Sequence, residues 1–550
     1  EQASKLFDAA AGNDVDAINK LYGLVTVDLD VGTEEKYAED FLDAGTSALW
    51  IACWYGSAQA VDMLAELGAD VGKCDKGGRS PLYAAASEGK SDVVRMLVEK
   101  HGEDANQARA ETGASIVWVA AFNGHSDTIG VLASLGADVK QASNEGATPV
   151  CIAAFNGHSD TIGVLASLGA DVKQADNDGY TPVFIAAKKG HSDTIGVLAS
   201  LGADVKQADK NGATPVLIAA LNGHSDTIGL LASLGADVKE ADNDGYTPVL
   251  IAAQEGHSDT IGVLASLGAD VKQADKNGYT PVLIAAENGH SDTIGVLASL
   301  GADVKQAAND GYTPVCIAAM NGHSDTIGVL ASLGADVKQA DNDGYTPVLI
   351  AAGKGHSDTI GVLASLGADV KEAANDGYTP VYVAAQNGHS DTIGVLASLG
   401  ADVKQANKNG ATPVFIAAQD GHSDTIGVLA SLGADVKQAN KNGATPVFIA
   451  AQKGHSDTIG VLASLGADVK EAANDGYTPV CIAAQNGHSD TIGVLASLGA
   501  DVKQADNDGY TPVYVAAQDG HSDTIGVLAS LGADVKQANK NGSTPVFIAA

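Results

Sequence analysis

The chain has 550 residues, enough for several globular domains, but its 65 glycines and only 3 tryptophans and 3 methionines argue against thick apolar cores. With 68 Asp and Glu against 32 Lys and Arg, the formal net charge of -36 argues against nucleic acids and anionic membrane surfaces as partners. A basic protein surface is the complementary partner, although the same charge also serves solubility alone.

Residues 1–41 form the least regular part of the chain. The stretch LFDAAAGNDVDAINKLYG reads as a helix pair, and the acidic insertion that follows it has Lys36 as its basic residue. We predict that residues 1–41 are a degenerate capping element, because the terminal unit of a repeat array has to cover an open apolar end.

Residues 42–109 hold two divergent copies of a unit that becomes regular further along the chain. Residues 42–74 contain LWIACWYG and residues 75–109 contain SPLYAAASEG, the second copy being two residues longer. Both strings have the small and apolar residues of a short buried helix followed by a glycine stop.

Residues 110–538 consist of 13 copies of a 33-residue unit, such as DNDGYTPVFIAAKKGHSDTIGVLASLGADVKQA at 176–208. Thr181 is expected to cap a first helix that has Pro182 at its first position and ends at Gly190. Ser192 is expected to cap a second helix that Gly202 ends. An extended stretch and an Asn-Asp-Gly or Lys-Asn-Gly turn of hairpin type follow.

Helices of this length are not stable alone, so each apolar face has to be buried against neighbouring copies. The sequence therefore predicts an all-α repeat solenoid with one continuous core. A further copy starts in residues 539–550, and we expect the protein to continue beyond Ala550.

The pattern G-x-TP-x-x-x-AA-x-x-GH followed by LGAD, with a period of 33 residues, resembles the ankyrin repeat over essentially the whole chain. The resemblance implies antiparallel helix pairs, projecting β-hairpin fingers, and a concave groove between the fingers and the first helices that contacts partner proteins. One departure concerns the His of the family's TPLH motif, which is replaced by Phe184, Leu217, Cys316 or Tyr382. We expect the first helical turn to be looser as a result.

The copies differ from one another mainly at the finger tips and at the ends of the first helices, where the resemblance places the groove. Lys188 and Lys189 end one such helix, whereas the second helices hardly vary. We predict protein binding at these positions, with drift at exposed sites as the alternative. The aromatic candidates are Trp54, Tyr55, Phe122 and Phe155 at helix ends, and Tyr180, Tyr246, Tyr279 and Tyr312 at finger tips. Packing beneath the N-terminal insertion or across a neighbouring finger is the alternative for them.

Ser192, Gly196 and Ser200 are spaced four residues apart and therefore form a stripe of small side chains on the second helix. The resemblance places this stripe on the convex face. A second contact surface there is one hypothesis, and a glycine inherited with each copied unit is the other, although glycine costs about 0.5–1 kcal/mol in a helix.

The histidines and cysteines recur with the unit. The His side chains are expected to be structural hydrogen-bonding groups, because copies about 10 Å apart cannot share a metal ion; collective protonation near pH 6 is the alternative. Cys151, Cys316 and Cys481 lie 165 residues apart, beyond disulfide reach, and are expected to be buried free thiols. Free thiols favour an intracellular location, the cytoplasm first and an organelle second.

No nucleotide-binding, hydrolase or metalloprotease motif is present in the sequence. We therefore expect no catalysis, no cofactor and no metal, and membrane contact only through a partner or a segment outside this sequence. The leading hypothesis is a non-catalytic scaffold for protein–protein interaction. The alternatives are a structural or elastic subunit of a large complex that uses the convex face, and an accessory arm of a larger enzyme or channel.

Overall fold

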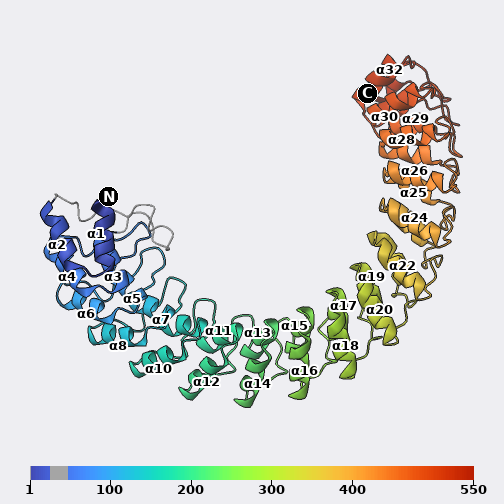
Figure 1. Cartoon of the computed structure of the whole chain (residues 1–550). Helices are drawn as coiled ribbons and strands as arrows, with labels where there is room; N and C mark the ends of the chain where they lie inside the picture. Colours follow the sequence, from blue (N-terminus) through green and yellow to red (C-terminus); the bar gives the residue numbers. More distant parts are fainter. Residues whose placement is uncertain (1, 25–46, 550) are drawn as a thin grey trace. The chain divides into compact units, whose positions relative to one another are not determined.

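The structure, a computed structural model, describes residues 2–24 and 47–549, and these residues form helices joined by turns (Figure 1). Contacts divide the chain into two compact units, Glu1–Lys276 and Asn277–Ala550. Each unit is a stack of short helix pairs, so the predicted helical repeat array is confirmed.

The helices of the first unit are α1 (Gln2–Ala11), α2 (Val15–Leu24), α3 (Ala48–Tyr55), α4 (Ala58–Glu66), α5 (Pro81–Ser87), α6 (Ser91–Glu99), α7 (Ile116–Phe122), α8 (Ser126–Ser134), α9 (Pro149–Phe155), α10 (Ser159–Ser167), α11 (Pro182–Lys189), α12 (Ser192–Ser200), α13 (Pro215–Leu221), α14 (Ser225–Ser233), α15 (Pro248–Gln254) and α16 (Ser258–Ser266). The helices of the second unit are α17 (Pro281–Glu287), α18 (Ser291–Ser299), α19 (Pro314–Met320), α20 (Ser324–Ser332), α21 (Pro347–Lys354), α22 (Ser357–Ser365), α23 (Pro380–Gln386), α24 (Ser390–Ser398), α25 (Pro413–Gln419), α26 (Ser423–Ser431), α27 (Pro446–Lys453), α28 (Ser456–Ser464), α29 (Pro479–Gln485), α30 (Ser489–Ser497), α31 (Pro512–Gln518), α32 (Ser522–Ser530) and α33 (Pro545–Ala549).

The core of each unit lies between successive pairs. Helix α21 packs against its own second helix, α22, and against the first helices of both neighbouring pairs, α19 and α23. Ala351, Ala352, Ile360 and Leu363 are fully buried in this way. Each apolar layer is therefore closed by the next copy, which explains how helices of seven to nine residues are stable here.

In the copies that contain Thr-Pro, the first helix starts where the sequence predicts, and in α21 it also stops there. At α21, Thr346 has an extended backbone (φ -74°, ψ 160°), and its hydroxyl accepts a hydrogen bond from the Leu349 amide at 3.3 Å. Pro347 takes the first helical position, and Gly355 ends the helix with a φ of +79°, a conformation that costs glycine little. The cap is formed without the family's histidine.

The start of the second helix differs from the prediction. In α12 the N-cap residue is His191, which makes no side-chain cap bond, and Ser192 is the first helical residue. The Ser192 hydroxyl instead lies 3.0 Å from the Thr227 hydroxyl of the next pair. The predicted Ser192 cap is therefore wrong: one position inside the helix, this side chain faces the neighbouring copy and links the two.

The expected β-hairpin fingers are not confirmed, since the described part of the chain contains no strand and a single isolated bridge, between Ala108 and Ser115. The finger at 176–180 is a turn closed by a bond from the Asp176 amide to the Tyr180 carbonyl at 3.1 Å. The Asp176 carboxylate also accepts from the amides of Asp178 and Tyr180 at 3.0 and 2.9 Å. A side chain thus takes amide hydrogens that a longer strand ladder would use.

Histidines join neighbouring pairs, as predicted for structural hydrogen-bonding groups. His356 Nε2 lies 3.0 Å from the Met320 carbonyl oxygen at the end of the preceding first helix, and His158 Nε2 lies 3.0 Å from the Phe122 carbonyl oxygen. This contact satisfies a carbonyl that the helix end leaves unpaired.

The second residue of a finger tip also forms a hydrogen bond with the finger of the preceding copy. Lys441 Nζ donates to the Lys408 carbonyl oxygen at 2.6 Å, and Asn474 Nδ2 donates to the Lys441 carbonyl oxygen at 3.3 Å. Asn and Lys are therefore interchangeable donors at this position, since either one reaches back to the preceding finger.

Helices α1 and α2 form the first pair of the chain and contact α3 and α4. The acidic insertion predicted after them falls mostly in residues 25–46, outside the described residues. The proposed boundaries at residues 41, 109 and 538 stay predictions.

Candidate functional site

The last residues of three first helices carry the exposed aromatic side chains of the first unit. Tyr55 ends α3, Phe122 ends α7 and Phe155 ends α9, with exposed fractions of 44%, 40% and 39%. The backbone of this row is held in place, because the carbonyl oxygens of Phe122 and Phe155 contact the Nε2 atoms of His158 and His191 at 3.0 and 3.1 Å. The rings therefore project from a fixed helix end.

The two lysines predicted as binding residues lie against these rings. Lys189 Nζ lies 4.2 Å from the centroid of the Phe155 ring, and Lys188 Nζ lies 5.6 Å from that of Tyr180. Tyr180 stacks in turn on Phe184 with centroids 4.8 Å apart and planes 2° apart. Four of the predicted site residues thus form two neighbouring cation–π pairs, Lys189 with Phe155 and Lys188 with Tyr180, on adjacent residues of one helix end.

Other predicted residues are placed differently. Trp54 is half-buried and stacks on the fully buried Trp50, with centroids 5.3 Å apart. Tyr279 and Tyr312 pack against the buried Leu283 and Ile317, which favours the packing alternative for these two finger tips. Tyr246 is half-buried in its own finger, two copies after Tyr180.

The residues of the stripe of small side chains on α12 have local partners. The Ser192 hydroxyl contacts Thr227, and the Ser200 hydroxyl donates to the Val197 carbonyl oxygen at 2.7 Å. Gly196 is different, because a Cβ atom added there would meet nothing within 4 Å. The stripe therefore has open space beside Gly196, whereas its two serine hydroxyls already have hydrogen-bond partners.

A leucine at the end of each regular second helix, beside the stripe, is partly exposed. Leu201 and Leu366 have exposed fractions of 40% each. In the second unit, a hollow of about 440 Å³ lies between neighbouring second helices, with Gly328, Ala331 and Leu366 among its lining residues.

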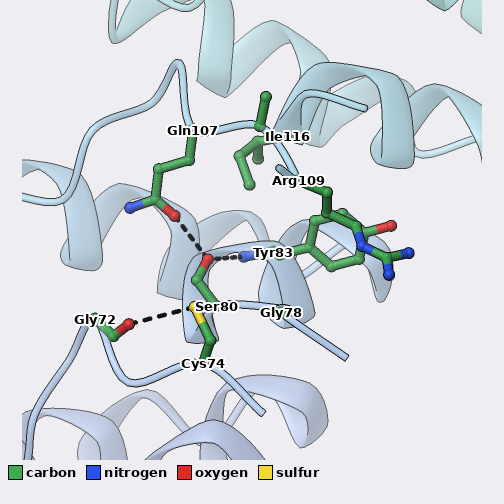
Figure 2. A pocket seen from close by; sticks show the side chains of 9 residues that line it. Gly72, Cys74, Gly78, Ser80, Tyr83, Gln107, Arg109 and Ile116 are labelled. Atoms are coloured by element: carbon green, nitrogen blue, oxygen red, sulfur yellow. Dashed lines mark hydrogen bonds between the residues drawn. The ribbon is translucent and has the colours of Figure 1, made fainter. Parts of the chain in front are cut away.

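The divergent copies contain a hollow that the sequence analysis did not identify (Figure 2). It has a volume of about 270 Å³, and Figure 2 shows Ser80 between Tyr83 and Gln107 at its centre. The Ser80 hydroxyl accepts from the Tyr83 amide at 3.1 Å and donates to Gln107 Oε1 at 2.7 Å. The lining residues are Gly72, Cys74, Gly78, Ser80, Tyr83, Gln107, Ala108, Arg109 and Ile116.

The polar groups around this hollow hold the fingers together, and its Cys74 thiol is not activated. Arg109 Nη2 donates to the Gly77 carbonyl oxygen at 2.9 Å, which ties one finger to the preceding one. Burial raises the pKa of the Cys74 thiol, and the carboxylates of Asp75 and Glu103 raise it further. Since the thiolate is the reactive form, Cys74 is a poor nucleophile. Burial also raises the pKa of Tyr83, against the opposing effect of Arg109.

Tyr83 belongs to a set of residues that takes the place of the family's TPLH histidine and that the sequence analysis treated only as a missing hydrogen bond. In this set, Trp50 and Trp118 donate their indole N–H groups to the Arg79 and Ala147 carbonyl oxygens of the next finger at 3.0 and 3.2 Å. The variation among Trp, Tyr, Phe, Leu and Cys at this position was the signal that it shapes the space beneath each finger.

No group of three or more metal-ligating side chains gathers anywhere in residues 2–24 and 47–549. Across the same ranges, no helix has both the length and the apolar character that crossing a bilayer requires.

A family model described as ankyrin repeats, three copies, matches residues 6–109, 117–209, 197–275, 267–341, 329–407, 396–473, 414–506 and 461–539. The E3 ubiquitin-protein ligase KEG of Arabidopsis thaliana is 34% identical over 102 residues, 18% of this chain and 6% of that protein. The ankyrin repeat and KH domain-containing protein mask of Drosophila melanogaster is 36% identical over 95 residues, 17% of this chain and 2% of that protein. The chain thus matches only small parts of these relatives, but the family model covers most of its length. The helix pairs, their caps and the repeated match lead to one conclusion: this chain belongs to the ankyrin-repeat family.

Proposed function

We propose that the chain is a non-catalytic protein–protein interaction scaffold whose partners bind along the finger tips and the ends of the first helices. The observation that supports this most directly is the two cation–π pairs at the end of α11, Lys189 with Phe155 and Lys188 with Tyr180. The exposed ring of Phe122 lies one copy before that of Phe155. Exposed aromatic rings on a fixed backbone supply large contact area at little entropic cost. A cation held over a ring adds directional polar contacts beside that area.

The proposed partners are proteins. The net charge of -36 favours a basic surface over most of the array and disfavours nucleic acid. The five cysteines are free, four of them buried, which supports an intracellular location with the cytoplasm first and an organelle second.

The test is a paired substitution in the full-length chain, Phe122→Gln with Phe155→Gln. Gln occupies the equivalent helix end in other copies, for example Gln254 and Gln386, so the fold has room for it. Affinity capture from cells of the source organism, quantified by mass spectrometry, is expected to show proteins that wild type retains and the double variant loses by tenfold or more.

Met320→Gln is the matched control, because Met320 ends α19 at the equivalent place in the second unit. It should retain the proteins that wild type retains. Equal capture by all three chains would show that partners bind elsewhere.

The convex face is the second candidate surface and fits a structural or elastic subunit of a large complex. Its support is the open space beside Gly196 together with the exposed leucines and the hollow near Gly328. Replacing Gly196 and its equivalents by Glu should abolish such an interaction. Unchanged partner binding together with higher stability would refute it, since glycine is a poor helix former.

The accessory-arm alternative draws on the comparisons. Segments similar to this chain make up 6% and 2% of two much longer proteins, one of them named as an E3 ubiquitin-protein ligase. Sequencing the complete coding region tests it, because a catalytic or channel domain in the same polypeptide would decide for this alternative.

A further inference from the structure

Finger tyrosines cover the first helices in most copies. In the second unit, Tyr378 stacks on Tyr382 with centroids 4.7 Å apart and planes 4° apart. Tyr510 lies over Tyr514 with centroids 5.0 Å apart. At these two fingers, as at Tyr180 above Phe184, a phenol ring of the chain itself fills the space above the aromatic ring of the helix.

Two adjacent fingers lack this cover. Ala411 and Ala444 take the place of the finger tyrosine, while Phe415 and Phe448 provide aromatic rings beneath them. Other fingers that end in Ala lie before a smaller or aliphatic residue, as Ala213 does before Leu217. The exception is Ala114, which lies before Trp118, and that ring stacks on Phe122 with centroids 5.8 Å apart. The fingers at 407–411 and 440–444 therefore combine an aromatic floor with a missing aromatic cover.

A hollow of about 550 Å³ lies at this place, within the range of about 300–1,000 Å³ that ligand pockets occupy. Tyr378 and Tyr382 form one wall, and Phe415 and Ile416 come from the next first helix. No carboxylate lines it, although the chain as a whole is strongly acidic. The lining residues are Tyr378, Tyr382, Gln386, Asn407, Asn409, Ala411, Phe415, Ile416, Gln419, Asn440, Lys441 and Asn442.

The first asparagines of the two fingers differ in whether the preceding first helix offers a hydroxyl group to their Nδ2 atoms. Asn407 accepts from the backbone amides of Asn409 and Ala411 through Oδ1, and its Nδ2 donates to the Tyr382 hydroxyl at 3.2 Å. Asn440 accepts from its own finger in the same way. The preceding helix, however, offers Asn440 the ring of Phe415, which has no hydroxyl oxygen to accept from Nδ2.

We propose that this hollow binds the tyrosine side chain of a partner protein, with the ring above Phe415 and the hydroxyl beside Asn440. The proposal rests on the proposed function, because it names the side chain that one part of the binding face takes. A phenol ring above Phe415 would restore the stacking that Tyr378 makes on Tyr382. Its hydroxyl would also bring to Asn440 an acceptor of the kind that Tyr382 gives Asn407 and that Phe415 lacks. The finger tyrosines at 378 and 510 of a second copy are poor occupants, since they are already stacked on their own helices.

The probe is an acetylated, amidated pentapeptide, Gly-Ser-Tyr-Ser-Gly, with 3-fluorotyrosine at its centre, and the readout is its ¹⁹F line width as the full-length chain is added. Broadening that the unlabelled tyrosine peptide reverses is expected, whereas the same peptide with Leu in place of Tyr should compete at least about tenfold less well. N-acetyltyrosine amide competes as well as the peptide if a free phenolic compound is the occupant, and less well if a polypeptide segment is. Binding of the free compound with equal strength would overturn the assignment to a protein partner.

Ala411→Tyr is the decisive variant, because it gives the finger the residue that other copies already have and fills the hollow from within. It should weaken peptide binding at least about tenfold, the effect expected when the aromatic contact and its buried area are lost. Ala213→Tyr is the matched control, since its finger also reads Lys-Asn-Gly-Ala but lies in the first unit. It should bind the probe as wild type does.

Phe415→Leu provides a second variant, with the residue that stands at this place in other copies, such as Leu349. It should remove the preference for Tyr over Leu peptides. Equal binding by wild type, Ala411→Tyr and Phe415→Leu, or no broadening with wild type, would overturn the proposal. Phe122→Gln with Phe155→Gln leaves the hollow intact, so loss of its captured proteins tests the proposed function separately.

Discussion

At the scale of single residues, the five cysteines differ in how far solvent reaches them. Cys53, Cys151, Cys316 and Cys481 are buried and Cys74 is exposed. Burial raises the pKa of the Cys53 thiol well above its usual value and also raises that of Cys74. We expect Ellman's reagent to modify one thiol in the native chain, more slowly than a free cysteine at the same pH, and five in denaturant. Cys74→Ser should leave no fast-reacting thiol; modification of two or more native thiols would contradict the burial.

The finger tyrosines predict a loss of stability at alkaline pH. Burial, with Asp376 close by, raises the pKa of Tyr345 to about 12, and burial with Asp506 does the same for Tyr477. An unfolded tyrosine has a pKa of about 10, so the unfolded chain ionises first as the pH rises. The stabilising contribution is therefore complete below about pH 10 and is lost as the pH rises through 12. Absorbance at 295 nm should show late-titrating tyrosines, and Tyr345→Phe with Tyr477→Phe should lose less thermal stability between pH 10 and 12 than wild type.

Sequence reasoning worked for residues whose environment the repeat itself defines. The buried thiols at Cys151, Cys316 and Cys481 and the hydrogen-bonded histidines follow from their fixed place in each copy. It failed at Ser192, because a shift of one position between a cap and a first helical residue decides whether the hydroxyl serves its own helix or the neighbouring one.

At the scale of helices and turns, two glycines of each copy have opposite roles. Gly361 lies inside α22, and a Cβ there would meet nothing within 4 Å. Gly355 ends α21 with a φ of +79°, and a Cβ there would lie 2.8 Å from His389 Nδ1. Gly361→Ala should stabilise the chain by about 0.5–1 kcal/mol, whereas Gly355→Ala should destabilise it, as denaturant midpoints will show.

The expected gain in stability becomes larger when Gly361 and its equivalents are all replaced by Ala, because an added Cβ meets open space at each of them. A combined variant that is less stable than wild type would mean that the face of the second helices that carries these glycines has a partner within the folded chain. The equivalents in the second unit are Gly295, Gly328, Gly394, Gly427, Gly460, Gly493 and Gly526.

Helix positions were predictable because Thr-Pro starts and glycine stops act locally, as at Thr346 and Gly355. The fingers were predicted as turns correctly and as β-hairpins without confirmation, since the Asp176 carboxylate takes the amide hydrogens of its own turn. The sequence predicted that Phe155 and Lys189 lie on one surface, but not that they touch. The distance between their side chains depends on how adjacent copies stack. The hollow beside Phe415 needed the structure, since it results from three copies acting together.

At the scale of the whole molecule, 68 acidic against 32 basic side chains lead us to expect net self-repulsion. Salt screens such repulsion over a Debye length of about 10 Å at 0.1 M. Raising potassium chloride from 10 to 500 mM at pH 7 should therefore raise the thermal midpoint. The rise should shrink at pH 4.5, where carboxylates begin to take up protons. A midpoint that falls with salt at pH 7 would show that attractive ion pairs outweigh the repulsion.

The bonds between copies have a further consequence for how such a gene changes. Ser225 meets Thr260 as Ser357 meets Thr392, at 3.0 and 2.9 Å, and the histidine contacts recur with the same spacing. Because nearly every junction is chemically the same, unequal crossing-over that deletes or inserts one 33-residue unit leaves no orphaned donor and no uncovered apolar layer. Individuals of the same species are therefore expected to carry arrays of different length, and the scarce positions that vary, such as Ala411, to mark copies retained for what they bind.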